Sequence, residues 1–472
     1  MSQFSIASTS KPQTATNIMA IEITGTPASG DTLIYNDSSN TFAYGSVSGP
    51  PPLTGTNVFL GVDSGTAITI GTNNTGTGCK SLAALTTGIN NVANGAQALE
   101  ALDVGSENTA VGFNALASQT NLNWSTAVGA HSMQNTTSGT NNTAVGAFSL
   151  AANTTGINNT CLGYSALSSN VSGGSNVAVG DGALALATGS YNNVAIGSSA
   201  LHPCVANQNT AVGSFSLGLN TMGSGNTANG AFSLTSNTTG SDNTAIGYNT
   251  LYNSNGSSNT ALGATALRSN TTGNSNVCLG NLALTANTTG SGNTVVGSQT
   301  ALNITAGSGN TVIGSSTGNA YSSNESNNIL INNAGVAGDL GTTRIATEGT
   351  QQGCYIAGIY GKIITTPGIP VQVDVTGKLG TIVSAKRFKE NIKPAKDYDI
   401  SNLKVVNYNL IGQSNQQVGL IAEDVEQVIP ELVVRDSEGS ILTVQYLSFI
   451  PILIKHCQML EARVLQLEQQ LP

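Results

Sequence analysis

The chain has little charge and few aromatic rings for its length. Only 8% of its 472 residues are charged, 5% are aromatic, and one is tryptophan. Between residues 78 and 318 there are two basic residues, Lys80 and Arg268. No basic stripe for phosphate groups can form there, and the net charge of −9 also argues against a nucleic-acid partner.

Cysteine and histidine are too scattered to predict a metal centre. The six cysteines lie far apart without Cys-x-x-Cys spacing, and the three histidines form no cluster. We therefore expect no metal and no cofactor. The cysteines are interpreted as small buried side chains, because Cys161 and Cys278 each stand where neighbouring repeats have alanine.

Long apolar runs are also missing. No stretch is apolar enough to cross a bilayer, so no membrane insertion is expected. Residues 1–6 have neither a basic region nor an apolar one, so no secretory signal is predicted.

What the chain does have is a glycine that returns every 16 or 17 residues. A repeat at this period predicts stacked coils, in an elongated protein whose surface rather than a cleft carries the function. The fifteen repeated glycines are Gly78, Gly95, Gly112, Gly129, Gly146, Gly163, Gly180, Gly197, Gly213, Gly230, Gly247, Gly263, Gly280, Gly297 and Gly314.

Each position of the repeat has its own residue preference. Asn stands four residues before the glycine in 14 of 15 repeats, with Ser125 as the exception, and stacked amides of this kind favour a ladder of hydrogen bonds. Thr or Val follows and indicates a strand, then a small residue, and then Val, Ile or Leu in 12 of 15 repeats. Leu four residues beyond the glycine gives a second inward anchor.

The unit Asn-Thr-Ala-Val-Gly-x-x-x-Leu, closed by Asn-Thr-Thr-Gly, predicts one coil of a parallel β-solenoid. Fifteen coils would make a rod of roughly 70 Å. In residues 143–145 the alternation places Thr and Val on one face and Ala on the other. Both faces look too apolar for water, so we expect a second surface to cover the Ala side.

The repeat resembles the head repeats of trimeric bacterial adhesins, whose motif Asn-x-Val-Ala-Ile-Gly is present at residues 192–197 in the form Asn-Asn-Val-Ala-Ile-Gly. The resemblance covers residues 78–318, although the unit here is longer. It implies β-rolls that pack three around an axis.

Composition divides the chain into four predicted parts. They are residues 1–60, an N-terminal β segment or anchor; 61–318, the solenoid; 319–383, a β-rich neck; and 384–472, a charge-rich C-terminal domain with nine of the 15 basic residues. Strand-like runs outside the repeat occur at 21–23, 32–35, 328–331, 343–345, 354–359 and 371–373.

The C-terminal part carries four motifs in a fixed order, at residues 384–392, 419–425, 430–433 and 444–446. Together they resemble the endosialidase-type intramolecular chaperone domain, the self-cleaving C-terminus of phage tail spikes and of related viral and cellular fibres. The resemblance covers residues 384–472 and implies a small α+β domain that is removed after assembly.

That family cleaves itself with a serine–lysine dyad, and its motif Ser-x-x-x-x-Lys falls on Ser384 and Lys389. The resemblance implies that Ser384 attacks the carbonyl of Val383 and forms an ester that water opens. On a regular helix a five-residue separation would point the two side chains about 140° apart, so we expect a loop at Ser384. The alternative is that Ser384 only caps a helix.

The chain ends in a heptad pattern that predicts a short coiled coil. Ile450, Cys457, Val464 and Leu471 occupy a positions, and Leu453, Leu460 and Leu467 occupy d positions. Stacked Asn-rich coils have a weak register, so a helical clamp that first gathers three chains would remove a costly search. Cleavage afterwards would make unfolding effectively one-way.

These observations predict a mainly β, homotrimeric viral fibre or tail spike that assembles in the host cytoplasm and, on the virion, attaches to a host surface glycan or receptor. Its enzyme activity would be one self-cleavage per chain. One alternative is a trimeric cell-surface adhesin. Another is a glycan- or ice-binding solenoid, for which a flat Thr-x-Thr array would be the sign.

Two further alternatives lack the residues that they need. A glycan-degrading fibre would need paired carboxylates, and the repeat has five scattered acidic residues. A self-cleaving membrane regulator of the same family would need a transmembrane segment.

Overall fold

The computed structural model describes residues 23–24, 32–36, 41–45, 57–347, 350–351, 356, 371–374, 377–381, 384–436 and 438–470. The chain forms two compact units, residues 1–354 and 355–472. In the first unit β1 (Ile23–Thr24), β2 (Thr32–Asn36) and β3 (Thr41–Gly45) form a three-stranded sheet with β3 in the middle.

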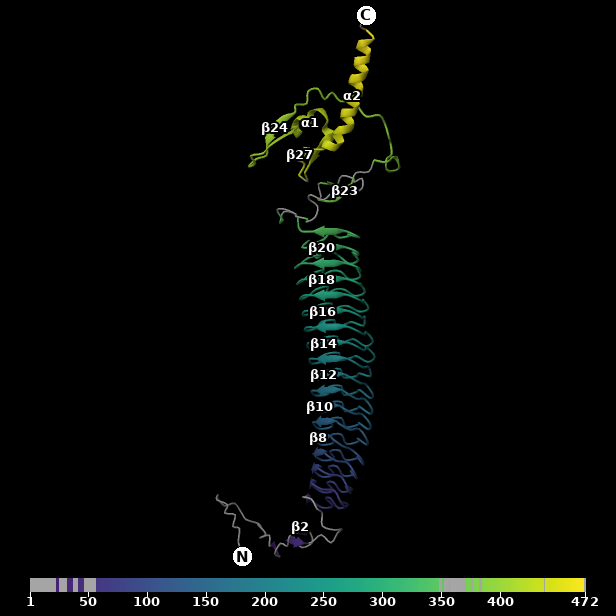
Figure 1. Ribbon diagram of the computed structural model, residues 1–472, viewed down its shortest axis with the longest axis vertical. Helices are drawn as coiled ribbons and strands as arrows, with labels where there is room; N and C mark the ends of the chain where they lie inside the picture. Colours follow the sequence, from purple (N-terminus) through teal and green to yellow (C-terminus); the bar gives the residue numbers. More distant parts are fainter. Residues whose placement is uncertain are drawn as a thin grey trace. The chain divides into compact units, whose positions relative to one another are not determined.

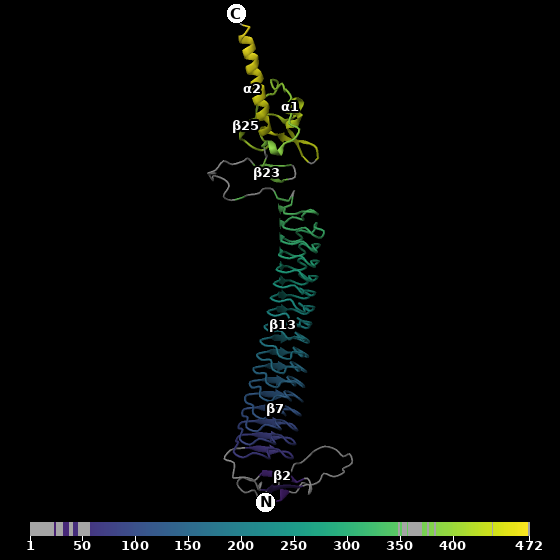
Figure 2. The ribbon, with the colours of Figure 1, turned by 90° about the vertical axis from the view of Figure 1, so that its right-hand side faces the viewer.

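Residues 58–345 of the first unit form a parallel β-solenoid, seen from two sides in Figures 1 and 2. Each strand from β4 to β21 pairs in parallel with the next, residue for residue. The strands are β4 (Val58–Leu60), β5 (Thr75–Thr77), β6 (Val92–Asn94), β7 (Thr109–Val111), β8 (Thr126–Val128), β9 (Thr143–Val145), β10 (Thr160–Leu162), β11 (Val177–Val179), β12 (Val194–Ile196), β13 (Thr210–Val212), β14 (Thr227–Asn229), β15 (Thr244–Ile246), β16 (Thr260–Leu262), β17 (Val277–Leu279), β18 (Thr294–Val296), β19 (Thr311–Ile313), β20 (Ile329–Ile331) and β21 (Thr343–Ile345).

The inside of each coil is set by the middle strand residue and the leucine after the glycine. Ala144 and Leu150 show this pattern, since both are fully buried in one continuous apolar core. The Ala side of the strand, which we expected a second surface to cover, is thus the interior of the coil. The leucines of the same stack cover it. The first and third strand residues point the other way and remain partly or largely exposed.

Buried asparagines join one coil to the next, as the sequence predicts. Asn159 donates from its backbone nitrogen to Asn142 Oδ1 at 2.9 Å and from its side-chain nitrogen to the same oxygen at 3.1 Å. Asn159 Nδ2 also donates to Gly173 O at 2.9 Å, which ties the ladder to the corner of its own coil. At Ser125 the ladder weakens, because Asn142 N reaches Ser125 Oγ only at 3.4 Å.

The repeated glycine sits where two coils pass too closely for a side chain. At Gly129 the φ angle is +131°, and an added Cβ would lie 2.6 Å from the carbonyl carbon and oxygen of Gly146. Any other residue would therefore strain the backbone and separate the coils.

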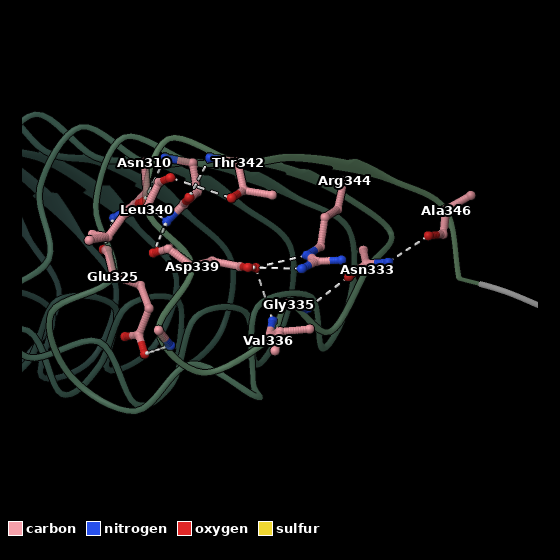
Figure 3. A network of polar contacts seen from close by, with 12 residues as sticks. Asn310, Glu325, Asn333, Gly335, Val336, Asp339, Leu340, Thr342, Arg344 and Ala346 are labelled. Carbon is pink, nitrogen blue, oxygen red and sulfur yellow. Dashed lines mark hydrogen bonds and ion pairs between the residues drawn. The ribbon is translucent and has the colours of Figure 1, made fainter. Parts of the chain in front are cut away.

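Acidic residues close the C-terminal end of the stack (Figure 3). Buried Glu325 accepts hydrogen bonds from Ser322 N at 3.1 Å and from Gly338 N at 3.1 Å. Arg344 donates from Nε to Asp339 Oδ2 and from Nη2 to Asp339 Oδ1, each at 2.8 Å. We call Glu325, Asp339 and Arg344 the end cap.

The second unit is a small α+β fold; this fold was predicted for residues 384–472, and the unit also includes part of the predicted neck. Its strands pair in antiparallel hairpins, β22 (Val371–Val373) with β23 (Leu379–Thr381), β24 (Val406–Asn409) with β25 (Gln416–Gly419), and β26 (Val433–Arg435) with β27 (Ile441–Val444). The helical elements are the 3-10 turns η1 (Lys386–Phe388) and η2 (Pro430–Leu432), and the helices α1 (Ala422–Val428) and α2 (Tyr446–Glu468). Its core contains Val425, Ile429, Leu432, Val444 and Phe449.

The predicted fold class is confirmed: the chain is mainly β, with a parallel solenoid followed by a small domain that ends in a helix. The stack has about 17 turns rather than 15, because β4 precedes the glycine-marked repeat and β20 and β21 follow it. The stack therefore continues into the segment that the sequence assigns to the neck. Most of the strand-like run 354–359 and residues 21 and 22 lie outside the described residues.

Candidate self-cleavage site

The residues around Ser384 form a tight turn rather than a regular helix. Ser384 and Ala385 precede η1, and Ala385 is extended, with φ −65° and ψ 142°. Lys389 leaves the turn with its backbone nitrogen donating to Lys386 O at 3.0 Å. A 3-10 turn followed by extended backbone reverses the chain over a few residues, which brings positions five apart together.

This turn places the two predicted catalytic side chains in contact. Lys389 Nζ lies 3.2 Å from Ser384 Oγ, within hydrogen-bond distance. That is the separation at which a base can take a hydroxyl proton. The bend that the five-residue spacing demands is therefore present.

The helix-cap alternative for Ser384 has no support in the geometry. The N-cap position of η1 is Ala385, and no side chain donates or accepts a capping hydrogen bond there. The Ser384 hydroxyl instead contacts Lys389.

The dyad is open to solvent in the single chain. Both Ser384 and Lys389 are exposed, and so are Phe388, with 55% of the residue's surface open to solvent, and Ile392, with 62%. The Arg387 guanidinium lies 4.6 Å from the centre of the Phe388 ring. Val383, the residue before the predicted cut, lies outside the described residues, so the catalytic roles stay a prediction.

The acidic pair in the end cap is structural rather than catalytic. Burial by itself would raise the pKa of Glu325, but hydrogen bonds from backbone N–H groups outweigh it and lower that pKa to about 2. The Arg344 guanidinium lowers the pKa of Asp339. A glycosidase needs one carboxyl group with a raised pKa, so this pair does not fit that chemistry. The sequence signal for the cap was acidic and basic residues at the end of a nearly uncharged repeat.

The buried cysteines behave as packing residues, as predicted. Burial raises the pKa of the Cys161 and Cys278 thiols, which keeps them protonated and unreactive. Cys204 is also buried. Cys79 and Cys457 depart from the prediction, because they are exposed, one on a surface turn and the other on α2. Cys354 lies outside the described residues.

The described part of the chain shows neither a metal site nor a membrane span. Within those residues no three or more His, Cys, Asp or Glu side chains come together as a metal site would require. None of the helices described there has the length and apolar character of a membrane span.

A known protein family matches the part of the chain that contains the contact between Ser384 and Lys389. Residues 384–434 match the family described as "Chaperone of endosialidase". The match begins at Ser384 and runs through α1 and η2 into β26. No curated protein matches the chain. The family match and the long parallel solenoid fit a phage tail fibre or spike with a C-terminal chaperone domain.

Proposed function

We propose that this fibre- or spike-type chain, with its C-terminal chaperone domain, assembles as a homotrimer and then cuts itself between Val383 and Ser384. The cut releases residues 384–472 and leaves the solenoid as the mature fibre. The observation that carries the proposal is the 3.2 Å contact between Lys389 Nζ and Ser384 Oγ, at the first residue of the family match.

The chemistry needs only these two side chains and water. Neutral Lys389 takes the proton of the Ser384 hydroxyl while Oγ bonds to the Val383 carbonyl carbon. The bond from that carbon to the Ser384 nitrogen then breaks, and Lys389 returns the proton to this nitrogen, which becomes a new amino terminus. Water next splits the ester, leaving a carboxylate on Val383 and restoring the Ser384 hydroxyl.

The exposure of the dyad ties this reaction to assembly. A lysine can act as a base near neutral pH only where burial or neighbouring cations favour its uncharged form. In the single chain Ser384 and Lys389 are exposed, beside the exposed apolar side chains of Phe388 and Ile392. Another copy that covers this surface would supply the missing burial, so cleavage would follow trimerisation.

The mature solenoid would then serve attachment to a host surface glycan or receptor from the virion. Two features support this role. The stack is a long repeated surface, and the two acidic residues of its end cap, Glu325 and Asp339, have lowered pKa values that do not suit glycan cleavage. A trimeric cell-surface adhesin would use the same kind of rod.

Denaturing gels of purified full-length protein test the proposal. The wild type should lose a fragment whose first residue, by mass spectrometry, is Ser384. Ser384→Ala and Lys389→Ala should remain intact, because each removes one half of the dyad. Ser401→Ala and Lys393→Ala, exposed positions of the same domain, should still be cut. An uncut wild type would refute the cleavage, and a monomer in analytical ultracentrifugation would refute the trimer.

A further inference from the structure

One face of the solenoid carries mostly β-branched and aliphatic side chains and no charge, and the described residues leave it uncovered along its whole length. It consists of the first and third residues of β4 to β21, and we call it the strand face. The first position is always Thr, Val or Ile, and the third is Val, Ile or Leu in fifteen of the eighteen strands. Neither position holds a charged residue in any of these strands.

Large side chains on the strand face are open to solvent in the single chain. Leu162 exposes 50% of its surface, Leu262 44% and Ile246 37%. A soluble chain rarely leaves so long an apolar strip facing water, and such a strip marks a surface of interaction.

The strand face is large enough for a stable protein interface. Eighteen strands about 4.8 Å apart give a strip of roughly 80 Å, and three residues across give a width of about 10 Å. The strip thus presents on the order of 800 Å², which is about what each partner contributes to a stable complex.

A glycan fits the surface of the strands and the residues that follow them less well than a protein partner does. Exposed aromatic rings follow the strands, but Phe215 and Phe232 stack in parallel at 5.5 Å, and His131 and Phe148 do so at 5.0 Å. Each ring of these pairs covers a face that a sugar would need for stacking.

Ice is also a poorer occupant, because the threonine column is irregular. Val92, Val194 and Val277 interrupt it, and bulky Leu and Ile side chains stand beside it in place of a second threonine column. The strand face therefore lacks the flat Thr-x-Thr array that was the expected sign.

We infer that the strand face packs against a second copy of this chain, so that it forms the interchain contact of the shaft. This inference rests on the proposed trimer and adds the surface through which its chains contact one another. A copy of the same rod offers an apolar, uncharged strip of equal length. Chains gathered at their C-terminal domains would also run in the same direction, which keeps like coils at the same height.

Cysteine labelling of full-length protein tests this inference. Thr260→Cys places a thiol on the strand face, and Thr239→Cys places one on an exposed turn of the same stack; both positions are exposed in the single chain. The native protein is treated with a bulky maleimide, and labelling is followed by mass spectrometry of the peptides. The wild type supplies the background from Cys79 and Cys457, which are exposed.

If the inference is correct, Thr260→Cys labels at least about tenfold more slowly than Thr239→Cys, because a packed interface excludes the reagent. In denaturant the two should label equally. Equal labelling of the two native variants, in a protein that sedimentation shows to be trimeric, overturns the inference but leaves the trimer standing. A monomeric wild type overturns both.

Discussion

At the scale of single residues, the core of each coil is a set of positions that depend on their neighbours above and below. A second asparagine column, at the start of the Asn-Thr-Thr-Gly turn, was not predicted. Asn170 Nδ2 donates to Asn153 Oδ1 at 2.9 Å. The column stops where the next coil has Ala187, and there the buried Asn170 Oδ1 lacks a hydrogen-bond partner.

The interruption at Ala187 is coupled to the residue three positions later. Coils with asparagine in this column have glycine there, as at Gly173, where an added Cβ would lie 2.3 Å from the backbone oxygen of Ser190 in the next coil and 2.4 Å from Asn170 Oδ1. In the coil of Ala187 that place is taken by Ser190, whose buried hydroxyl also lacks a partner. With alanine at position 187, Ser190 meets no asparagine amide of its own coil.

This coupling predicts a non-additive pair of substitutions. Ala187→Asn alone should lower the free energy of unfolding, because the amide meets Ser190. Ala187→Asn with Ser190→Gly should raise it by about 1 kcal/mol, since the new amide satisfies Asn170 Oδ1. Unfolding in urea measures both. As a matched control, Asn170→Ala with Gly173→Ser should destabilise, and a double variant at 187 and 190 no more stable than the single one would contradict the coupling.

At the scale of elements, no further coil follows the last strands of the stack. The end cap supplies hydrogen bonds that such a coil would otherwise provide. An edge of a parallel stack leaves backbone groups unpaired. At this end Asn328 Oδ1 accepts from Thr342 N at 2.8 Å, which ends the first asparagine ladder, and Glu325 and Asp339 take the free N–H groups of nearby turns. Figure 3 shows Asp339 paired with Arg344, with Glu325 on a neighbouring loop.

The cap predicts acid sensitivity at the C-terminal end of the stack. The pKa of Glu325 falls from its usual 4.5 to about 2 in the folded chain, so its stabilisation is complete above about pH 4.5 and is lost as the pH falls towards 2. The rate of amide hydrogen exchange in the peptide 322–338, relative to the rate in a mid-stack peptide, should rise as the pH falls from 4.5 towards 2.

Glu325→Gln should show the faster exchange already at neutral pH and change less on acidification. Asp242→Asn, which removes an exposed carboxylate from the middle of the stack, should behave like the wild type. An acid response that is the same in the wild type and Glu325→Gln would show that another group is responsible.

At the scale of the whole molecule, each of the two units exposes an apolar seam that its own described residues leave uncovered. In the solenoid this is the strand face. In the C-terminal unit, α2 exposes Ile450 at 51%, Leu460 at 53% and Val464 at 52%, all at a or d positions of the predicted heptad. Leu471, the last a position, lies outside the described residues.

The seam on α2 predicts that assembly depends on it. Leu460→Glu with Val464→Glu should leave the chains monomeric and reduce self-cleavage by at least about tenfold, because charges at a and d positions oppose helix association. Sedimentation and denaturing gels measure the two effects. Gln458→Glu with Gln466→Glu adds the same charge at exposed positions outside the seam and should leave both unchanged. If the seam variant still forms a trimer and is still cleaved, assembly does not depend on α2.

The local pattern of residues was enough to predict the coil, the first asparagine ladder and the C-terminal domain. Each depends on neighbours within one repeat, as in Asn-Thr-Ala-Val-Gly, or on motifs that resemble a known domain. The contact between Ser384 and Lys389 could be anticipated only as a need for a bend, because the spacing alone does not fix the turn. The end cap and the second asparagine column depend on which residues lie in adjacent coils, and these were missed.

The sequence by itself determined the repeat, because one residue type at one position must serve the same role in every coil. It also showed that the repeated strand has one face of small residues, mostly Ala, and one Thr/Val face. Only the tertiary structure decided which face is inside. Most coils close on the leucine that follows the glycine, and the space left beside that leucine admits alanine, so the branched side chains of the strand are turned outward.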